Sequence, residues 1–171
     1  MLSASELSGM ISDVFRLHSE FPKSPEKAFR KFDGRTPYGV HPTLAAMLFA
    51  HEESLYEDLR VLGIKALLGH DLIEDTTAPL PAWCSDPEVE LYIRELTFTE
   101  GQNPLVDIWH RGHIAILLKF YDVVANLMCA GAMKPERAKE RQMYADRMLA
   151  YIKDIYPQLE ILKIARGLLR A

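Results

Sequence analysis

The chain has 171 residues, of which 49% are hydrophobic and 26% charged, and its formal net charge is −4. This length fits one domain, which can bury about 68–70% of the surface of its unfolded chain. The acidic balance argues against a broad basic surface for nucleic acid polymers or anionic membranes, although a small anionic ligand needs only one basic pocket.

The cysteine content and the apolar runs favour a cytoplasmic protein. Cys84 and Cys129 are too few for a disulfide framework, and neither has the spacing of a zinc site. Residues 1–15 contain no basic stretch before an apolar block, so they do not resemble a signal peptide. The longest aliphatic run, 114–118, is too short to cross a membrane.

Helical periodicity dominates the first seventy residues. The first apolar stripe is formed by Leu7, Ile11, Val14 and Phe15. Pro42 fits the first position of a second helix, which would make His41 its N-cap. A further stripe, which ends at His70, is formed by Leu55, Leu59, Leu62 and Ala66.

The second half continues with helices. Ser85 and Glu88 have the spacing of a capping box. A long helix begins near His113 and carries the stripe Ile114, Leu117, Tyr121, Val124 and Met128. Pro135 opens another helix, and Pro157 separates it from a C-terminal one. The irregular segments are 21–40 and 76–83, and no alternating strand pattern occurs, so we predict a single-domain all-α bundle over 1–171.

The stretch LLGHDLIED, residues 67–75, is the most informative part of the sequence. His70 and Asp71 are adjacent at the end of an apolar run, and Glu74 and Asp75 follow one helical turn later. No Lys or Arg occurs between positions 65 and 94. Carboxylates near the C-terminal end of a helix oppose the helix dipole, and a bound cation would reverse the sign of that interaction. The sequence therefore predicts a site for a divalent metal ion.

Four residues are the candidate ligands of this ion, namely His41, His70, Asp71 and Asp122. Two imidazoles and two carboxylates suit Mn²⁺, Fe²⁺, Zn²⁺ or Co²⁺. On the long helix, spacings of four, three and four residues align one flank of the apolar stripe, formed by Ala115, Lys119, Asp122 and Asn126. A carboxylate and an amide on the same flank can face a shared pocket.

Four motifs in this order carry a family resemblance. They are RKFDGRTPYGVHP (30–42), ALLGHDLIEDT (66–76), Leu96-Thr97 and LLKFYDVVANL (117–127). Together they resemble the HD-domain metal-dependent phosphohydrolases, and most of all the branch with the alarmone hydrolases of the Rel/Spo type. The resemblance covers about residues 25–130, and helices over 135–170 would complete the single domain.

The resemblance implies a role for each candidate residue. His41, His70, Asp71 and Asp122 would coordinate one divalent ion, manganese in most members of this branch, with Mg²⁺ as a further alternative to the ions named above. Glu74 and Asp75 would handle the attacking water and the proton transfer. The groups expected to contact a phosphorylated, nucleotide-like substrate are Arg30, Lys31, Lys119 and Asn126.

Three departures from the family pattern leave several functions open. Val123 stands where the family usually carries a basic residue, Ala125 where it carries His or Tyr, and 98–118 contains no Lys. The sharpest hypothesis is hydrolysis of the 3′-pyrophosphate of guanosine 3′,5′-bis(diphosphate). The alternatives are a nucleotidase or phosphodiesterase, a non-catalytic nucleotide-binding regulatory module, or a purely structural helical protein. The number of subunits is open, since the Met and Tyr side chains of the last two helices fit either the core or the contact of a homo-oligomer.

Overall fold

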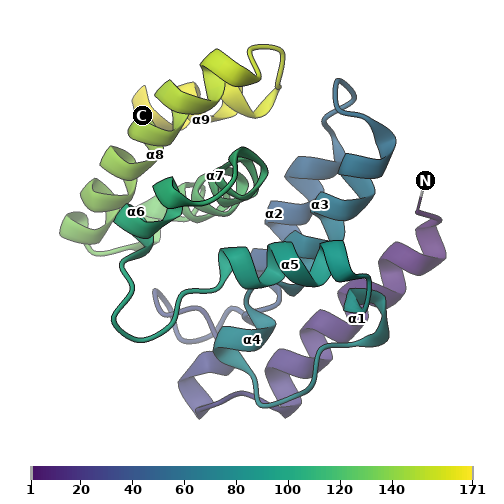
Figure 1. Cartoon of the computed structure of the whole chain (residues 1–171). Helices are drawn as coiled ribbons and strands as arrows, with labels where there is room; N and C mark the ends of the chain where they lie inside the picture. Colours follow the sequence, from purple (N-terminus) through teal and green to yellow (C-terminus); the bar gives the residue numbers. More distant parts are fainter. Residues whose placement is uncertain (1, 171) are drawn as a thin grey trace.

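The structure is a computed structural model that describes residues 2–170, and it is built from helices (Figure 1). The α-helices are α1 (Ala4–Glu20), α2 (Val40–Ala50), α3 (Glu57–Gly69), α4 (Leu72–Asp75), α5 (Pro87–Leu96), α6 (Pro104–Asp107), α7 (His113–Leu127), α8 (Pro135–Ile155) and α9 (Ile161–Arg170). Four short 3-10 turns join them, namely η1 (Pro25–Ala28), η2 (Ala82–Cys84), η3 (Ile108–His110) and η4 (Ala130–Ala132). Within the described range β-pairing is limited to isolated bridges, so the predicted all-α fold is confirmed.

Helix α7 lies in the middle of the bundle. In Figure 1 it runs between α8 and α9 on one side and α2 and α3 on the other, and it contacts all four of them as well as α5. Every residue from 115 to 125 is buried, so neighbouring elements cover this helix on all sides, including its polar flank. Lys119 and Asp122 are therefore charges inside a core, and each needs a partner there.

Helices α2 and α3 form an antiparallel hairpin that brings two histidines together. A short loop joins the two helices, and such loops place neighbouring helices antiparallel. The helices also approach closely at Gly63, where an added Cβ would lie 2.2 Å from the Phe49 ring. The start of α2, with His41, consequently lies beside the end of α3, with His70.

Two predicted helix starts are wrong by one or two residues. Helix α2 begins at Val40 with Gly39 as N-cap, so His41 lies in the first turn rather than at the cap. The N-cap of α5 is Asp86, whose side chain accepts from the Glu88 amide at 2.9 Å, because Pro87 occupies the first helical position. Ser85 instead donates its hydroxyl to the Ala82 carbonyl at 2.6 Å and so closes η2.

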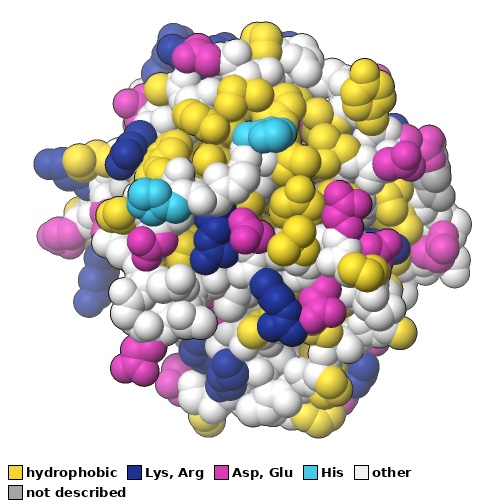
Figure 2. All heavy atoms as spheres, in the orientation of Figure 1, with side chains coloured by type: hydrophobic (Ala, Val, Ile, Leu, Met, Phe, Trp, Pro, Cys, Tyr) yellow, Lys and Arg dark blue, Asp and Glu magenta, His cyan; other side chains and the backbone are white. Residues whose placement is uncertain are grey.

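The surface seen in the orientation of Figure 1 mixes charges of both signs. Figure 2 shows acidic and basic side chains interspersed on this face, with hydrophobic side chains between them. Among residues 2–170, no helix combines the length and the apolar character that crossing a membrane would require.

A buried carboxylate links the loop after α2 to the middle of α7 and to the start of α9. Glu52 is 1% exposed, and it accepts the Tyr121 hydroxyl of α7 at 2.7 Å. It also accepts the backbone amides of Glu160 and Ile161, at 2.9 and 2.8 Å, where α9 begins. The negative charge therefore lies at the N-terminus of a helix, where the dipole stabilises it.

We expect Glu52→Ala to lower the free energy of unfolding by about 3 kcal/mol, because three donors, two of them buried, lose a charged acceptor. Urea denaturation followed by circular dichroism measures this. Glu53→Ala is the matched control, since Glu53 is exposed, and it should change stability by less than about 0.5 kcal/mol. Equal losses in the two variants would contradict this role of Glu52.

Candidate metal centre

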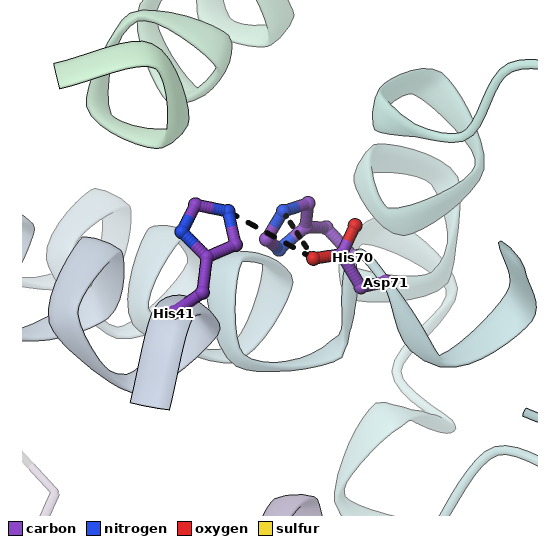
Figure 3. A group of neighbouring side chains, drawn as sticks. All are labelled: His41, His70 and Asp71. Carbon is purple, nitrogen blue, oxygen red and sulfur yellow. Dashed lines mark ion pairs between the residues drawn. The ribbon is translucent and has the colours of Figure 1, made fainter. Parts of the chain in front are cut away.

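Three segments bring the four predicted ligands to one place. His41 projects from the first turn of α2, and His70 and Asp71 follow the last turn of α3. Figure 3 shows the two imidazoles and the Asp71 carboxylate turned toward one another. One donor atom from each of these three buried residues lies within 4.8 Å of the other two, so they could hold a metal ion. Asp122 approaches them from the middle of α7.

The distances between donor atoms suit a shared ion. The His41 Nε2 atom lies 2.7 Å from Asp122 Oδ1 and 3.9 Å from Asp71 Oδ2. The His70 Nε2 atom lies 3.2 Å from Asp71 Oδ2 and 3.8 Å from Asp122 Oδ1. Ligands about 2.1 Å from one ion lie about 3.0–3.4 Å apart, so small side-chain shifts would complete the coordination.

Two of these donor atoms have no hydrogen-bond partner within the described chain. His70 Nε2 and Asp71 Oδ2 are both buried and, although they lie 3.2 Å apart, neither makes a hydrogen bond, which is costly for buried polar atoms unless something else satisfies them. The other nitrogen of His70, Nδ1, lies 2.7 Å from the Leu67 carbonyl, so it carries the proton and directs Nε2 toward the cluster. The donor set and its unsatisfied atoms therefore fit a divalent ion.

The pKa shifts within the cluster show that its two carboxylates favour positive charge beside them. Burial would raise the pKa of Asp122, but Lys119, whose Nζ lies 2.7 Å from Oδ2, and the two imidazoles hold that pKa well below its usual range. Burial would lower the pKa of His70, but the charges of Asp71 and Asp122 raise it to about 9. Burial prevails at His41 and lowers its pKa. A proton on His70 and the Lys119 ammonium thus supply positive charge to two buried carboxylates.

Two hydrogen bonds connect Asp122, through Asn126, to Arg30 in the loop before α2. Asn126, one turn after Asp122, donates to its Oδ1 at 2.8 Å. The Asn126 oxygen accepts from the Arg30 guanidinium at 2.6 Å, and this group lies over the rings of Phe32 and Tyr38. Arg30 is buried and held in place, whereas Lys31 is exposed. The amide predicted to bind substrate is therefore also the link between two other predicted residues.

The two acids predicted to transfer protons have different surroundings. The Glu74 side chain lines the cavity beside the cluster and remains accessible from it. The surrounding protein still removes part of its hydration, and this partial burial together with the charges of Asp71 and Asp75 raises its pKa. Asp75 is buried and forms an ion pair with Lys27 of η1. The sequence did not suggest Lys27, because the pair joins residues far apart in the chain.

A cavity of about 530 Å³ opens beside the cluster, a size that suits a small-molecule ligand. All the predicted site residues except His70 line it. Three basic residues that sequence reasoning missed also line it, namely Lys134, Arg137 and Arg141. Their spacing of three and four residues places them on one face of α8, but the sequence alone does not tell which way that face points.

Comparison with known proteins agrees with this architecture. No protein-family model matches the sequence, and no curated protein matches it either. A solved structure described as a metazoan ortholog of SpoT that hydrolyzes ppGpp and plays a role in starvation responses superposes with a TM-score of 0.69. The match covers 99% of this chain and 97% of that chain, with 17% sequence identity.

The chain has the HD-type helical fold of that hydrolase. At 17% identity the likeness concerns the fold, and it extends over the whole length of the bundle, including the C-terminal helices. The predicted HD-type architecture is therefore confirmed, while the roles of single residues rest on the geometry described above.

Asp122→Asn should lower the metal content of the purified protein at least tenfold, because it removes the donor nearest to His41. It should also destabilise the metal-free protein by about 3 kcal/mol, since Lys119 loses its buried partner. Elemental analysis and urea denaturation measure the two effects. Asp146→Asn on the exposed face of α8 is the control, and both values should stay at the wild-type level. Wild-type metal content in Asp122→Asn would show that Asp122 is not a ligand.

Proposed function

We propose that this chain is a metal-dependent phosphohydrolase that acts on a small nucleotide-like substrate. The observation that supports it most is the buried cluster of two imidazoles and two carboxylates in the wall of a cavity rich in basic side chains. The fold shared with a ppGpp hydrolase favours the same reaction class. Within that class we propose hydrolysis of the 3′-pyrophosphate of an alarmone, with manganese as the resident ion.

In this proposal His41, His70, Asp71 and Asp122 hold the divalent ion. A divalent ion held there would supply Lewis acidity toward a phosphoryl group and lower the pKa of a water molecule. Glu74 accepts a proton from the attacking water as the new oxygen–phosphorus bond forms. It then returns the proton to the leaving oxygen as the old bond breaks. Its raised pKa suits a group that must both accept and donate a proton near neutral pH.

The charge of the cavity favours a substrate with more than one phosphate group. Seven basic and five acidic side chains line it, and a divalent ion would add two positive charges. Arg30, Lys31 and Lys119 come from the loop before α2 and from α7. Lys134, Arg137 and Arg141 come from the N-cap and the first turns of α8. A nucleotide with phosphates at two positions would match this arrangement, because each group would meet its own cations.

The two residues that differ from the usual residues of the family lie in the core rather than in the cavity wall. Val123 and Ala125 are both fully buried, and neither lines the cavity. Basic side chains from α8 lie around the cavity instead. These departures therefore carry little weight against a phosphate-rich substrate.

Glu74→Gln should retain the metal of the wild-type protein and lose at least about 100-fold in kcat, because the amide cannot exchange a proton with water. Purified protein is assayed with Mn²⁺ for release of phosphate or pyrophosphate from ppGpp, nucleoside mono-, di- and triphosphates and cyclic nucleotides. Glu88→Gln, on the exposed face of α5, is the control and should keep full activity. Loss of metal in Glu74→Gln would make Glu74 a ligand. Nucleotide binding by the wild type without turnover would instead indicate a regulatory module.

The double variant Arg137→Gln/Arg141→Gln should raise KM for ppGpp at least tenfold and change KM for nucleoside monophosphates by less than threefold. The reason is that ppGpp carries phosphate groups at two positions of its ribose, whereas a monophosphate carries one at a single position. Lys139→Gln is the matched control, since Lys139 lies on the same helix outside the cavity lining. An equal rise of KM for both substrate types would argue against a separate phosphate contact on α8.

A further inference from the structure

The segment between α1 and η1 is fastened to the short helix α4, which carries Glu74 and Asp75. The Lys23 amide donates to the Asp75 carbonyl at 2.9 Å, and the Lys23 ammonium donates to the Ile73 carbonyl at 2.8 Å. The Thr77 amide donates to the Phe21 carbonyl at 2.8 Å. These bonds join residues about fifty positions apart and hold the two segments side by side.

Lys27 adds a charged contact to this attachment. Its ammonium forms a hydrogen-bonded ion pair with Asp75 Oδ1, and it also donates to the Glu74 carbonyl at 3.3 Å. The Asp75 side chain is 6% exposed and that of Lys27 is 26% exposed, so water screens the pair only in part. Asp75 is thus held in one place by a cation from a different segment.

The two neighbouring acids therefore have different surroundings. The Glu74 side chain forms no hydrogen bond or ion pair with the described residues, and it faces the cavity. Burial would lower the pKa of Lys27, but Asp75 raises it, so the ammonium stays charged throughout the physiological range. The Asp75 carboxylate is thus engaged by Lys27, whereas the Glu74 carboxylate, whose pKa is raised, is free to exchange a proton with a molecule in the cavity.

We propose that Lys27 is a positioning residue that holds Asp75 as a fixed counter-charge, and that Glu74 alone exchanges the proton in hydrolysis. This inference rests on the proposed phosphohydrolase function and assigns separate roles to the two acids of that site. Glu74 takes the proton of the attacking water while the oxygen–phosphorus bond forms, and gives it to the leaving oxygen while the second bond breaks. Asp75 takes no part in the proton transfer, and its charge raises the pKa of Glu74.

The pH dependence of turnover follows from the charges that face Glu74. These are Asp71 and Asp75 at α4, Lys119 on α7 and Lys27 on η1. Lys27 lowers the pKa of Glu74, and the two aspartates raise it. Removing the Lys27 charge should therefore shift the acid limb of the kcat profile to higher pH, because Glu74 must be deprotonated to accept a proton. Removing the Asp75 charge should shift that limb to lower pH.

The test compares variants of the full chain with Mn²⁺ and ppGpp as the probe. Asp75→Asn should lose about tenfold in kcat with KM unchanged, whereas Glu74→Gln loses at least about 100-fold. Lys27→Met should lose more than the double variant Lys27→Met/Asp75→Asn, because only the single variant leaves a buried carboxylate without its cation. Lys27→Arg should restore at least half of the wild-type kcat. Lys23→Met is the matched control, since its ammonium contacts only a carbonyl, and kcat should stay within twofold.

The outcomes separate this inference from the function on which it rests. If the wild type releases no phosphate or pyrophosphate from ppGpp or any other nucleotide, the proposed function fails and the inference fails with it. If the wild type is active, an Asp75→Asn variant that keeps its metal and is as inactive as Glu74→Gln overturns the inference alone. A double variant whose loss equals the product of the two single losses would also overturn it, because the two side chains would then act independently.

Discussion

Two buried carboxylates, Asp71 and Asp122, lie around the same pair of imidazoles inside an otherwise apolar bundle, and their charge has to be balanced in place. Burial of unbalanced charge costs many times the net stability of a domain, so a positive group must be present. Within the protein itself, Lys119 and a proton on His70 provide it. A divalent ion would meet the same need more completely, since it would also satisfy the unbonded atoms His70 Nε2 and Asp71 Oδ2.

The architecture of the bundle follows from the need to bring these groups together. The antiparallel hairpin of α2 and α3 places His41 and His70 at one end, and the central position of α7 places Asp122 between them. Asn126 then extends the cluster to Arg30, and α4 presents Glu74 to the same cavity. Asn126 is held by Asp122, and Arg30 by Asn126, so this part of the cavity wall depends on the central charge balance.

The sequence predicted the parts of this arrangement that depend on local spacing. The His70-Asp71 pair at a helix end and the flank with Lys119, Asp122 and Asn126 could be placed from periodicity, because helical geometry fixes which residues share a face. His41 was a candidate ligand from its residue type and its place at the start of a predicted helix, and the family resemblance implied the same role. The errors at helix starts, two residues at α2 and one at α5, came from competing caps. Gly39 rather than His41 caps α2, and Asp86 rather than Ser85 caps α5, because Pro87 occupies the first position of α5.

Contacts between distant segments could not be predicted in this way. The pairing of Lys27 with Asp75 depends on how η1 packs on α4, and nothing in either segment specifies it. The direction of the basic face of α8 depends on how that helix packs on α7. The same tertiary packing gives Glu74 and Asp75 different surroundings, although the local sequence pattern does not distinguish these two adjacent acids.

Anomalous X-ray diffraction at the manganese absorption edge, from crystals grown with Mn²⁺, tests the central claim most directly. The account predicts one strong peak within about 2.3 Å of donor atoms from His41, His70, Asp71 and Asp122, with the Lys119 ammonium displaced from Asp122 Oδ2. A protein that shows no peak there, and keeps Lys119 on Asp122 at saturating Mn²⁺, would contradict it.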